Sequence, residues 1–328
     1  MVTKLLRLFA AFVVGVGLAA SLPFPAWAQT WPSKPIRFFV PFPGGGSTDA
    51  VARAMQPALE KILGQSVVVE NRAGAGGMLG VDAVAKAAPD GYTIGIAGAG
   101  ALGVNIGERI KRPYDPLKDL VLISRAAASP FMLVAHPSLK ADTVADAIKL
   151  AKAEPNKLSI GHGGNGTAMH LAALAFAAAA DVKINLVPYR GTAPAVTDAI
   201  AGHVPLAIAD PPPSMGAIGE GKLKLIGVTS RNRYAVFPNA ASFHEMGLKD
   251  FDVTGWFGIA APAATPRDIV TKLNAAIVAA LKDPEVVRRI RTVGMEVTPT
   301  TPEEFAAFLR SEIEKAAKVA APAAERAN

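Results

Sequence analysis

Short apolar segments alternate with helix-like segments along this chain, and several of these transitions pass through a Gly-rich loop. An apolar segment over 36–41 meets the glycines at 44–46, and a helical pattern follows over 48–63. Further along, the Gly-rich loop over 161–166 opens an Ala-rich helical segment over 167–180. Alternating strands and helices are typical of sheets covered by helices. The sequence therefore predicts the α/β fold class, with no fixed-period repeat and no low-complexity linker between independent domains.

The N-terminal segment predicts export. Lys4 and Arg7 precede an apolar run over 8–22, and a small-x-small triplet ends at Ala28. This order is typical of a secretory signal peptide, so we expect residues 1–28 to be removed after Ala28 and the remainder to reach the periplasm. A membrane anchor is the alternative. The short run and the prolines Pro23 and Pro25 argue against it.

Composition excludes several classes of site. The chain has no Cys, so it has neither disulfides nor thiolate metal sites. Its net charge of +7 is scattered rather than clustered with aromatic residues, which argues against nucleic-acid binding and favours anionic solutes. The five histidines have no recognisable metal-ligand spacing, so we expect no metal and no cofactor: His136, His162, His170, His203 and His244.

The two Gly-rich loops are the candidate sites. Glycines let a ligand approach the backbone, and the helix that follows offers unpaired N–H groups and a positive dipole end. Ordinary tight turns remain an alternative for either loop. Asp49 either caps its helix or accepts from a ligand, and Asp210, at the end of a buried strand, either fixes a turn or contacts a ligand. His170 either lines a cleft or packs.

Enzyme motifs are incomplete. Gly161, Gly163 and Gly166 match a dinucleotide fingerprint, but the acidic residue Asp181 precedes the next strand instead of following it. No G-x-S-x-G nucleophile motif occurs. We therefore expect a binding protein and keep a secreted hydrolase of small esters or amides as the alternative.

Three C-terminal helices are predicted to begin at prolines, where the missing N–H costs nothing. We expect these helices over 266–281, 284–293 and 302–320. The residues before the prolines are predicted N-caps: Thr265, Asp283 and Thr301.

Many short motifs together resemble one family, the Bug family of periplasmic receptors, which are the TctC-like substrate-binding components of tripartite tricarboxylate transporters. The resemblance extends from about Trp31 to about Ala317. The motifs that carry it are Trp31 to Arg37, Pro43 to Asp49 with Ala52-Arg53, Val68 to Arg72, Gly74 to Gly77, Pro89 to Thr93, Asn165 to Thr167 with His170-Leu171, Val187 to Gly191 with Ala193-Pro194, Ser242-Phe243, Glu245, Gly247, Gly255-Trp256 and Ala261-Pro262.

The resemblance implies a type II periplasmic-binding-protein-like fold, with two α/β lobes and a ligand cleft between them. The expected division is residues 29–126 and 256–328 for one lobe and 127–255 for the other. Hinge closure is expected near 126–130 and 254–257. The implied partners are a small organic anion and membrane transporter subunits, with a sensor kinase as an alternative partner. The protein is expected to be a monomer.

Family members hold carboxylates through backbone amides of Gly-rich loops and through ordered waters. Mapped onto this chain, with Asp210 and the loop near Ala99 as further candidates, the expected ligand-binding residues are Pro43, Gly44, Gly45, Gly46, Ser47, Asp49, Ala99, Asn165, Gly166, Thr167, His170, Tyr189, Gly191, Thr192 and Asp210.

Two departures from the family pattern concern the ligand. A rigid run Pro211-Pro212-Pro213 follows Asp210, and the loop over 98–103 has no Ser or Thr. Both remove polar contacts near the expected cleft. They put a plain succinate- or citrate-type ligand in doubt and leave room for an aromatic or otherwise apolar-bodied carboxylate. The expected ligand is therefore a small organic carboxylate, either a di- or tricarboxylate or an aromatic carboxylate.

Overall fold

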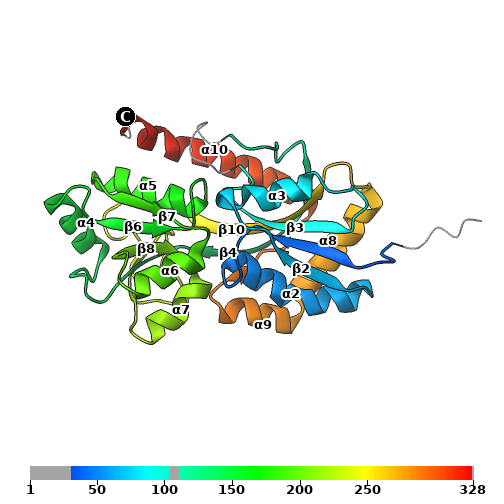
Figure 1. Cartoon of the computed structure of the whole chain (residues 1–328), viewed down its shortest axis with the longest axis horizontal. Coiled ribbons are helices and arrows are strands. Elements are labelled where there is room, and N and C mark those ends of the chain that lie inside the picture. Colours follow the sequence, from blue (N-terminus) through cyan, green and yellow to red (C-terminus); the bar gives the residue numbers. More distant parts are fainter. Residues whose placement is uncertain (1–30, 104–110, 327–328) are drawn as a thin grey trace, which may run out of the picture. The chain divides into compact units, whose positions relative to one another are not determined.

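The computed structural model describes residues 31–103 and 111–326. The predicted signal peptide lies outside these residues. Within them the strands form two separate sheets. In Figure 1, β6, β7 and β8 of one sheet lie to the left of β4 and β10, which belong to the other sheet together with β2 and β3 on the right.

The first sheet has the strand order β11-β4-β10-β3-β1-β2. β1 pairs in parallel with β2 and β3, whereas β10 pairs antiparallel with β3 and β4. Apolar residues alternate or run continuously along these strands, so most positions of β1, β3 and β10 are buried. The strands span β1 Ile36–Val40, β2 Val67–Asn71, β3 Thr93–Gly98, β4 Leu120–Pro130, β10 Thr254–Pro262 and β11 Glu296–Val297.

The helices around the first sheet follow the expected start and stop signals. α2 begins after Gly46 and ends at Gly64, whose left-handed φ of 67° and N–H bond to Glu60 O terminate it. The elements are α2 Ser47–Leu63, the 3₁₀ turn η1 Ala75–Gly77, α3 Met78–Ala85, α8 Arg267–Lys282, α9 Pro284–Thr292 and α10 Pro302–Arg326.

The second sheet has the order β7-β6-β8-β5-β9. β6 is parallel to β7 and β8, and β5 is antiparallel to β8 and β9. The strands are β5 Met132–Ala135, β6 Ser159–His162, β7 Asn185–Pro188, β8 Leu206–Ala209 and β9 Lys224–Val228. The helices are α4 Val144–Ala153, α5 Ala168–Ala180, α6 Thr192–Ile200 and α7 Pro211–Gly219.

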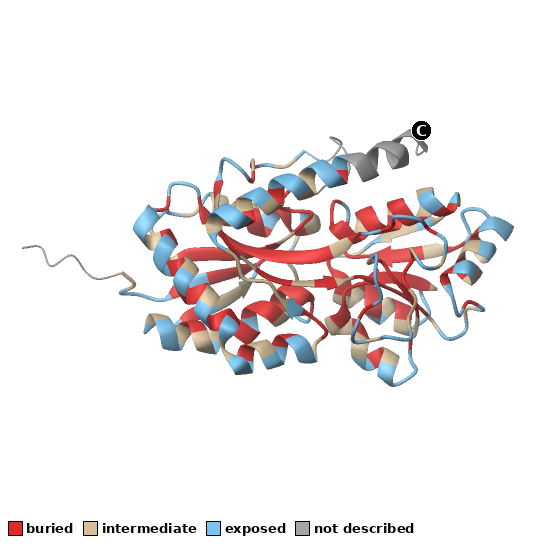
Figure 2. Cartoon of the chain, turned by 180° about the vertical axis from the view of Figure 1, so that it is seen from behind, coloured by how far each residue is buried: buried red, intermediate tan, exposed pale blue. Residues whose placement is uncertain are grey.

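The chain passes between the sheets twice. Only Phe131 separates β4 from β5, and the chain returns between β9 and β10. The two passages lie side by side, because Thr254 pairs with Pro130 and Phe257 with Ala127. α10 lies against β4 of the first sheet and α5 beside the second. Figure 2 shows the strands buried and the outer helix faces exposed.

Some predicted boundaries were wrong. Pro211 to Pro213 form the first turn of α7 rather than a separate rigid run, because proline is tolerated in a helix's first turn. Pro266, not Thr265, is the N-cap of α8, and the Thr265 hydroxyl donates to Pro262 O instead. Asp283 and Thr301 were predicted correctly, since both accept N–H groups of their own first turns.

Candidate functional site

Two adjoining cavities lie beside the N-termini of α2, which packs on the first sheet, and of α5 and α6, which pack on the second. Both are lined by Phe42, Met169 and Phe257. The polar cavity is lined by Phe42, Pro43, Gly46, Ser47, Thr48, Met169, Gly191, Thr192, Ala193, Pro194, Asp210 and Phe257. The apolar cavity is lined by Phe42, Gly76, Gly98, Ala99, Gly100, Ala101, Phe131, Thr167, Ala168, Met169, Gly255, Trp256 and Phe257.

The N-termini of α2 and α6 open into the polar cavity without side-chain caps. Their N-caps are Gly46 and Gly191, and neither has a capping hydrogen bond. The first N–H groups of a helix have no acceptor within the helix. The N–H group of Thr192 is therefore open to the cavity, whereas that of Ser47 lies against the Asp210 carboxylate. No Lys or Arg is among the described residues that line either central cavity. Backbone donors and helix dipoles therefore supply the positive potential there.

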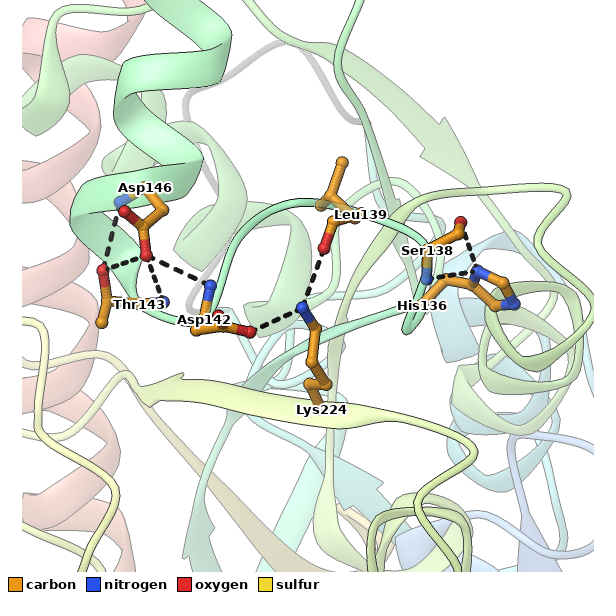
Figure 3. Close-up of polar contacts among 7 residues, drawn as sticks. All are labelled: His136, Ser138, Leu139, Asp142, Thr143, Asp146 and Lys224. Atoms are coloured by element: carbon orange, nitrogen blue, oxygen red, sulfur yellow. Dashed lines mark hydrogen bonds and ion pairs between the residues drawn. The ribbon is translucent and has the colours of Figure 1, made fainter.

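Helices that begin away from the cavities are mostly capped. The α4 N-terminus, drawn in Figure 3, is a capping box: Asp146 N donates to Thr143 Oγ1 at 3.2 Å, and Thr143 N donates to Asp146 Oδ2 at 3.0 Å. α9 is capped by Asp283 and α10 by Thr301, while α8 lacks a cap. The bare N-termini of α2 and α6 thus coincide with a cavity.

The α5 N-terminus at the apolar cavity is capped. The Thr167 hydroxyl accepts from His170 N at 3.2 Å and donates to Gly164 O at 2.7 Å. Among the described residues of that lining, Thr167 has the one hydroxyl group, and both its donor and its acceptor role are filled. The apolar cavity therefore offers a ligand mainly aromatic, methyl and methylene surface.

Asp210 is the N-cap of α7, but its carboxylate caps nothing. Pro211, Pro212 and Pro213 have no N–H groups, so the first turn of α7 presents no donor. Asp210 is 3 % exposed and lines the polar cavity. Neither its Oδ1 nor the Ser47 hydroxyl has a hydrogen bond of normal geometry within the described residues.

Burial raises the pKa of Asp210, and the nearby Ser47 and Thr192 groups lower it by less. Its carboxyl group is thus harder to ionise than one in water. A buried acceptor without a matched donor is unusual and points to a missing partner.

Asp49 has a different place. Its carboxylate accepts from Gly45 N at 3.1 Å, from Arg53 Nε at 3.0 Å and from Asn71 Nδ2 at 3.0 Å. Burial pushes the pKa of Asp49 up, but these hydrogen bonds bring it below its usual value. Asp49 holds the loop of Gly44 and Gly45 to the body of the first sheet, and it does not line the central cavities.

His162 and His170 stack with their ring centroids 4.7 Å apart. Each accepts a loop amide through Nδ1, His162 from Gly164 N and His170 from Gly166 N, both at 3.3 Å. Burial, with His170 nearby, lowers the pKa of His162 to about 4, and burial lowers the pKa of His170. Both rings are therefore neutral near pH 7 and fix the loop after β6.

Backbones of the two sheets' loops meet closely around the cavities. A Cβ on Gly76 would overlap the carbonyl oxygen of Asn165, and one on Gly100 would overlap that of Gly166. A Cβ on Gly191 would lie 3.3 Å from Pro43 Cδ. Glycine at these positions permits the approach of the two halves.

The predicted residues divide into groups. Six line the polar cavity: Pro43, Gly46, Ser47, Gly191, Thr192 and Asp210. Ala99 and Thr167 line the apolar cavity, while Asn165 and Tyr189 line a third, outer cavity with Phe42 and Arg190. The linings of these three cavities do not include Gly44, Gly45, Asp49, Gly166 and His170.

Several lining residues were not predicted, and three of them are shared between cavities. Phe42 borders all three cavities, and Met169 and Phe257 border both central ones. Phe42 follows β1, Met169 is in the first turn of α5 and Phe257 lies within β10. Each is apolar, as ordinary core residues are. Only the position of Phe42 beside the first Gly-rich loop was a usable signal.

Within the described residues, no helix is long and apolar enough to cross a membrane. In the same ranges, no group of three or more His, Cys, Asp or Glu residues is arranged to hold a metal ion.

Comparison with known proteins gives consistent results. The family described as tripartite tricarboxylate transporter family receptor matches residues 51–322. The protein BugT of Bordetella pertussis is 37% identical over 318 residues, which cover 97% of this chain and 96% of BugT.

Two solved structures extend the comparison. The periplasmic binding protein BugD is 32% identical with a TM-score of 0.85, covering 90% of this chain and 99% of BugD. An R. palustris protein solved with adipate is also 32% identical with a TM-score of 0.85, covering 90% and 98%. The two sheets and these structures confirm the predicted two-lobed α/β fold.

Proposed function

The chain belongs to the TctC/Bug family of periplasmic solute-binding proteins, and from this premise we propose that it captures a small organic carboxylate in the polar and apolar cavities. The observation that carries the proposal is the convergence of two uncapped helix N-termini, α2 and α6, on one cavity without a cationic side chain. This arrangement suits an anion because backbone N–H groups and helix dipoles both favour negative charge.

The ligand class follows from the two linings. The carboxylate group binds at the N-termini of α2 and α6, and the rest of the ligand lies against Phe42, Phe257 and the apolar cavity. Structures of two relatives have the dicarboxylates adipate and malate as their named ligands. Few free polar side chains lie around Ala99, which favours a ligand with a larger apolar part than malate, either an alkyl chain or an aromatic ring.

The proposed cycle is closure of two lobes on the ligand. One lobe comprises residues 29–126 and 256–328, and the other comprises 127–255, with the hinge at 126–130 and 254–257. The close approach of Gly76 to Asn165 and of Gly100 to Gly166 supports a closed arrangement. The mature protein acts as a periplasmic monomer after cleavage behind Ala28, and the closed form delivers its ligand to the membrane subunits of a tripartite tricarboxylate transporter.

The first test is a thermal-shift and calorimetric screen of the purified protein against adipate, malate, citrate, benzoate and amino acids. A ligand at about one hundred times its Kd adds about 2.7 kcal/mol to the free energy of unfolding. Stabilisation by carboxylates, with the ligand recovered unchanged by mass spectrometry, is expected. Hydrolysis of an ester or amide analogue would favour the hydrolase alternative. No stabilisation by any anion would refute the proposal.

Closure is tested by Gly100→Ala. The added methyl group would overlap Gly166 O and the backbone of Thr167 only when the loops are together. Overpacking of this kind costs about 1–3 kcal/mol, so affinity should fall roughly 5- to 150-fold. Gly216→Ala is the matched control, because a Cβ there meets nothing within 4 Å and Gly216 lies outside both cavities. Equal affinity in both variants would contradict closure.

A further inference from the structure

The carboxyl group of Asp210 shares the polar cavity with the proposed site of the ligand's carboxylate. It is directed there because three consecutive prolines leave it no helix N–H to cap. Its nearest polar neighbours are Ser47 on α2 and Thr192 on α6, the first residues of the two uncapped helices. The same donors therefore serve Asp210 and an incoming anion.

Among the described residues, no cationic side chain lines the polar cavity where these two negative charges would meet, and Arg190, just before α6, lines the outer cavity instead. The lining of the polar cavity contains no Lys, Arg or His among the described residues. His162 and His170, at the β6–α5 loop, stack on each other and accept loop amides. Lys61 lies in the last turn of α2, at the opposite end from Ser47.

The other ionisable side chains on elements packed around Asp210 have partners of their own. On α2, Asp49 pairs with Arg53, and Glu60 accepts from Val67 N. On α6, Asp198 accepts from Tyr189. At α9, Glu285 pairs with both Arg288 and Arg289, Arg291 pairs with Glu296, and the Tyr234 hydroxyl donates to Gly294 O.

We propose that Asp210 takes up one proton when an anionic ligand binds, so that ligand and Asp210 form a singly charged pair of carboxyl groups. Two buried carboxylates in one site cannot both ionise without a large energetic cost, and the pair retains one proton. Protonated Asp210 can then donate its O–H to the ligand's carboxylate. The raised pKa of Asp210 in the ligand-free cavity is in the direction that favours this uptake.

The inference predicts a specific pH dependence and rests on the proposed function. Below the pKa of Asp210 in the ligand-free protein the group is already neutral, so affinity is maximal and flat. Above that pKa each pH unit lowers affinity about tenfold, until the pKa in the complex is reached.

The experiment is calorimetric titration with adipate, malate and benzoate at about pH 8, in phosphate and in Tris, whose ionisation enthalpies differ. We expect about one proton taken up per ligand bound. Asp210→Asn should abolish the uptake and the pH dependence. Asp268→Asn, in the exposed first turn of α8, should retain both. Circular dichroism checks that Asp210→Asn is folded, and the wild-type proton count stands without that variant.

Each outcome has one meaning. Binding without proton uptake, or uptake that persists in Asp210→Asn, overturns the inference and leaves the proposed function intact. Tighter binding of amino acids than of their deaminated analogues, without proton uptake, assigns Asp210 to an ionised acceptor and also overturns it. No binding of any tested acid refutes the proposed function, and the inference falls with it.

Discussion

The N-termini of α4 and α2 differ in whether a side chain accepts the first N–H groups of the helix. At α4, Thr143 and Asp146 occupy the first-turn donors within the chain, on an exposed surface. At α2, Gly46 offers no side-chain acceptor, and the helix begins at a buried cavity. Stability alone favours the capped version. The bare version is understandable where another molecule supplies the acceptor. α8 also lacks a cap away from the cavities, so it is the coincidence of two bare N-termini with one cavity that indicates the candidate site.

The α5 N-terminus is capped like that of α4 but lies at a cavity like that of α2. The histidines beside it give the largest effect that we predict, a loss of stability in acid. The amides of the loop before α5 are accepted by neutral imidazoles, and the pKa of His162 is lowered to about 4 by burial. Below pH 6.5 the unfolded chain binds a proton that the native histidine resists, so stability should decrease as pH falls from about 6.5 to about 4. The loss is on the order of 3 kcal/mol. Denaturant unfolding across this range measures it.

The control for the acid effect is His162→Gln, whose side-chain oxygen can still accept Gly164 N–H but cannot titrate. Its unfolding free energy should vary less over the same pH range than that of the wild type. Identical pH profiles for the two proteins would assign the acid sensitivity to other groups.

Gly46→Ser should convert the α2 N-terminus into the α4 type. Gly46 has the extended backbone of an N-cap, with φ of −88° and ψ of 176°, and a Cβ there meets nothing within 4 Å. The Ser hydroxyl would take one donor from the ligand. Because a hydrogen bond to a charged group contributes about 1.5–3 kcal/mol, carboxylate affinity should fall at least about tenfold.

The same variant should be more stable than the wild type without ligand, by a few tenths of a kcal/mol. Thermal unfolding with and without adipate separates the two effects. Unchanged affinity would mean that α2 does not hold the carboxylate.

Thr143→Ala makes the opposite change to Gly46→Ser, because it removes a cap, and it has the smallest expected effect. Removing the α4 cap should lower the free energy of unfolding by about 1 kcal/mol. Carboxylate affinity should stay constant, because Thr143 lies outside both central cavities. A loss of affinity in this variant would break the distinction between structural and ligand-facing N-termini.

Local sequence signals predicted most elements, and they failed where contacts are distant. β1, α2 and α5 lie within one residue of their expected bounds because apolar runs and Gly-rich loops mark their ends. The roles of Asp49 and Asp210 stayed open, since Asn71, which holds Asp49, is 22 residues away. Pro211 to Pro213 were misread because proline suits both rigid loops and first helical turns. Phe42, Met169 and Phe257 resemble core residues until both halves of the chain are assembled.

Because the proposed donors of α2 and α6 belong to the main chain, substitutions around the cavities fall into two kinds. Every residue type except proline carries the same N–H group, so most substitutions at Ser47 or Ala193 would leave the proposed recognition of negative charge in place. Substitutions at Phe42, Ala99 or Phe257 would instead reshape the space for the ligand's carbon body. On this proposal, a few substitutions in the cavity lining after gene duplication could change which carboxylate is bound. Each intermediate protein would still bind carboxylates.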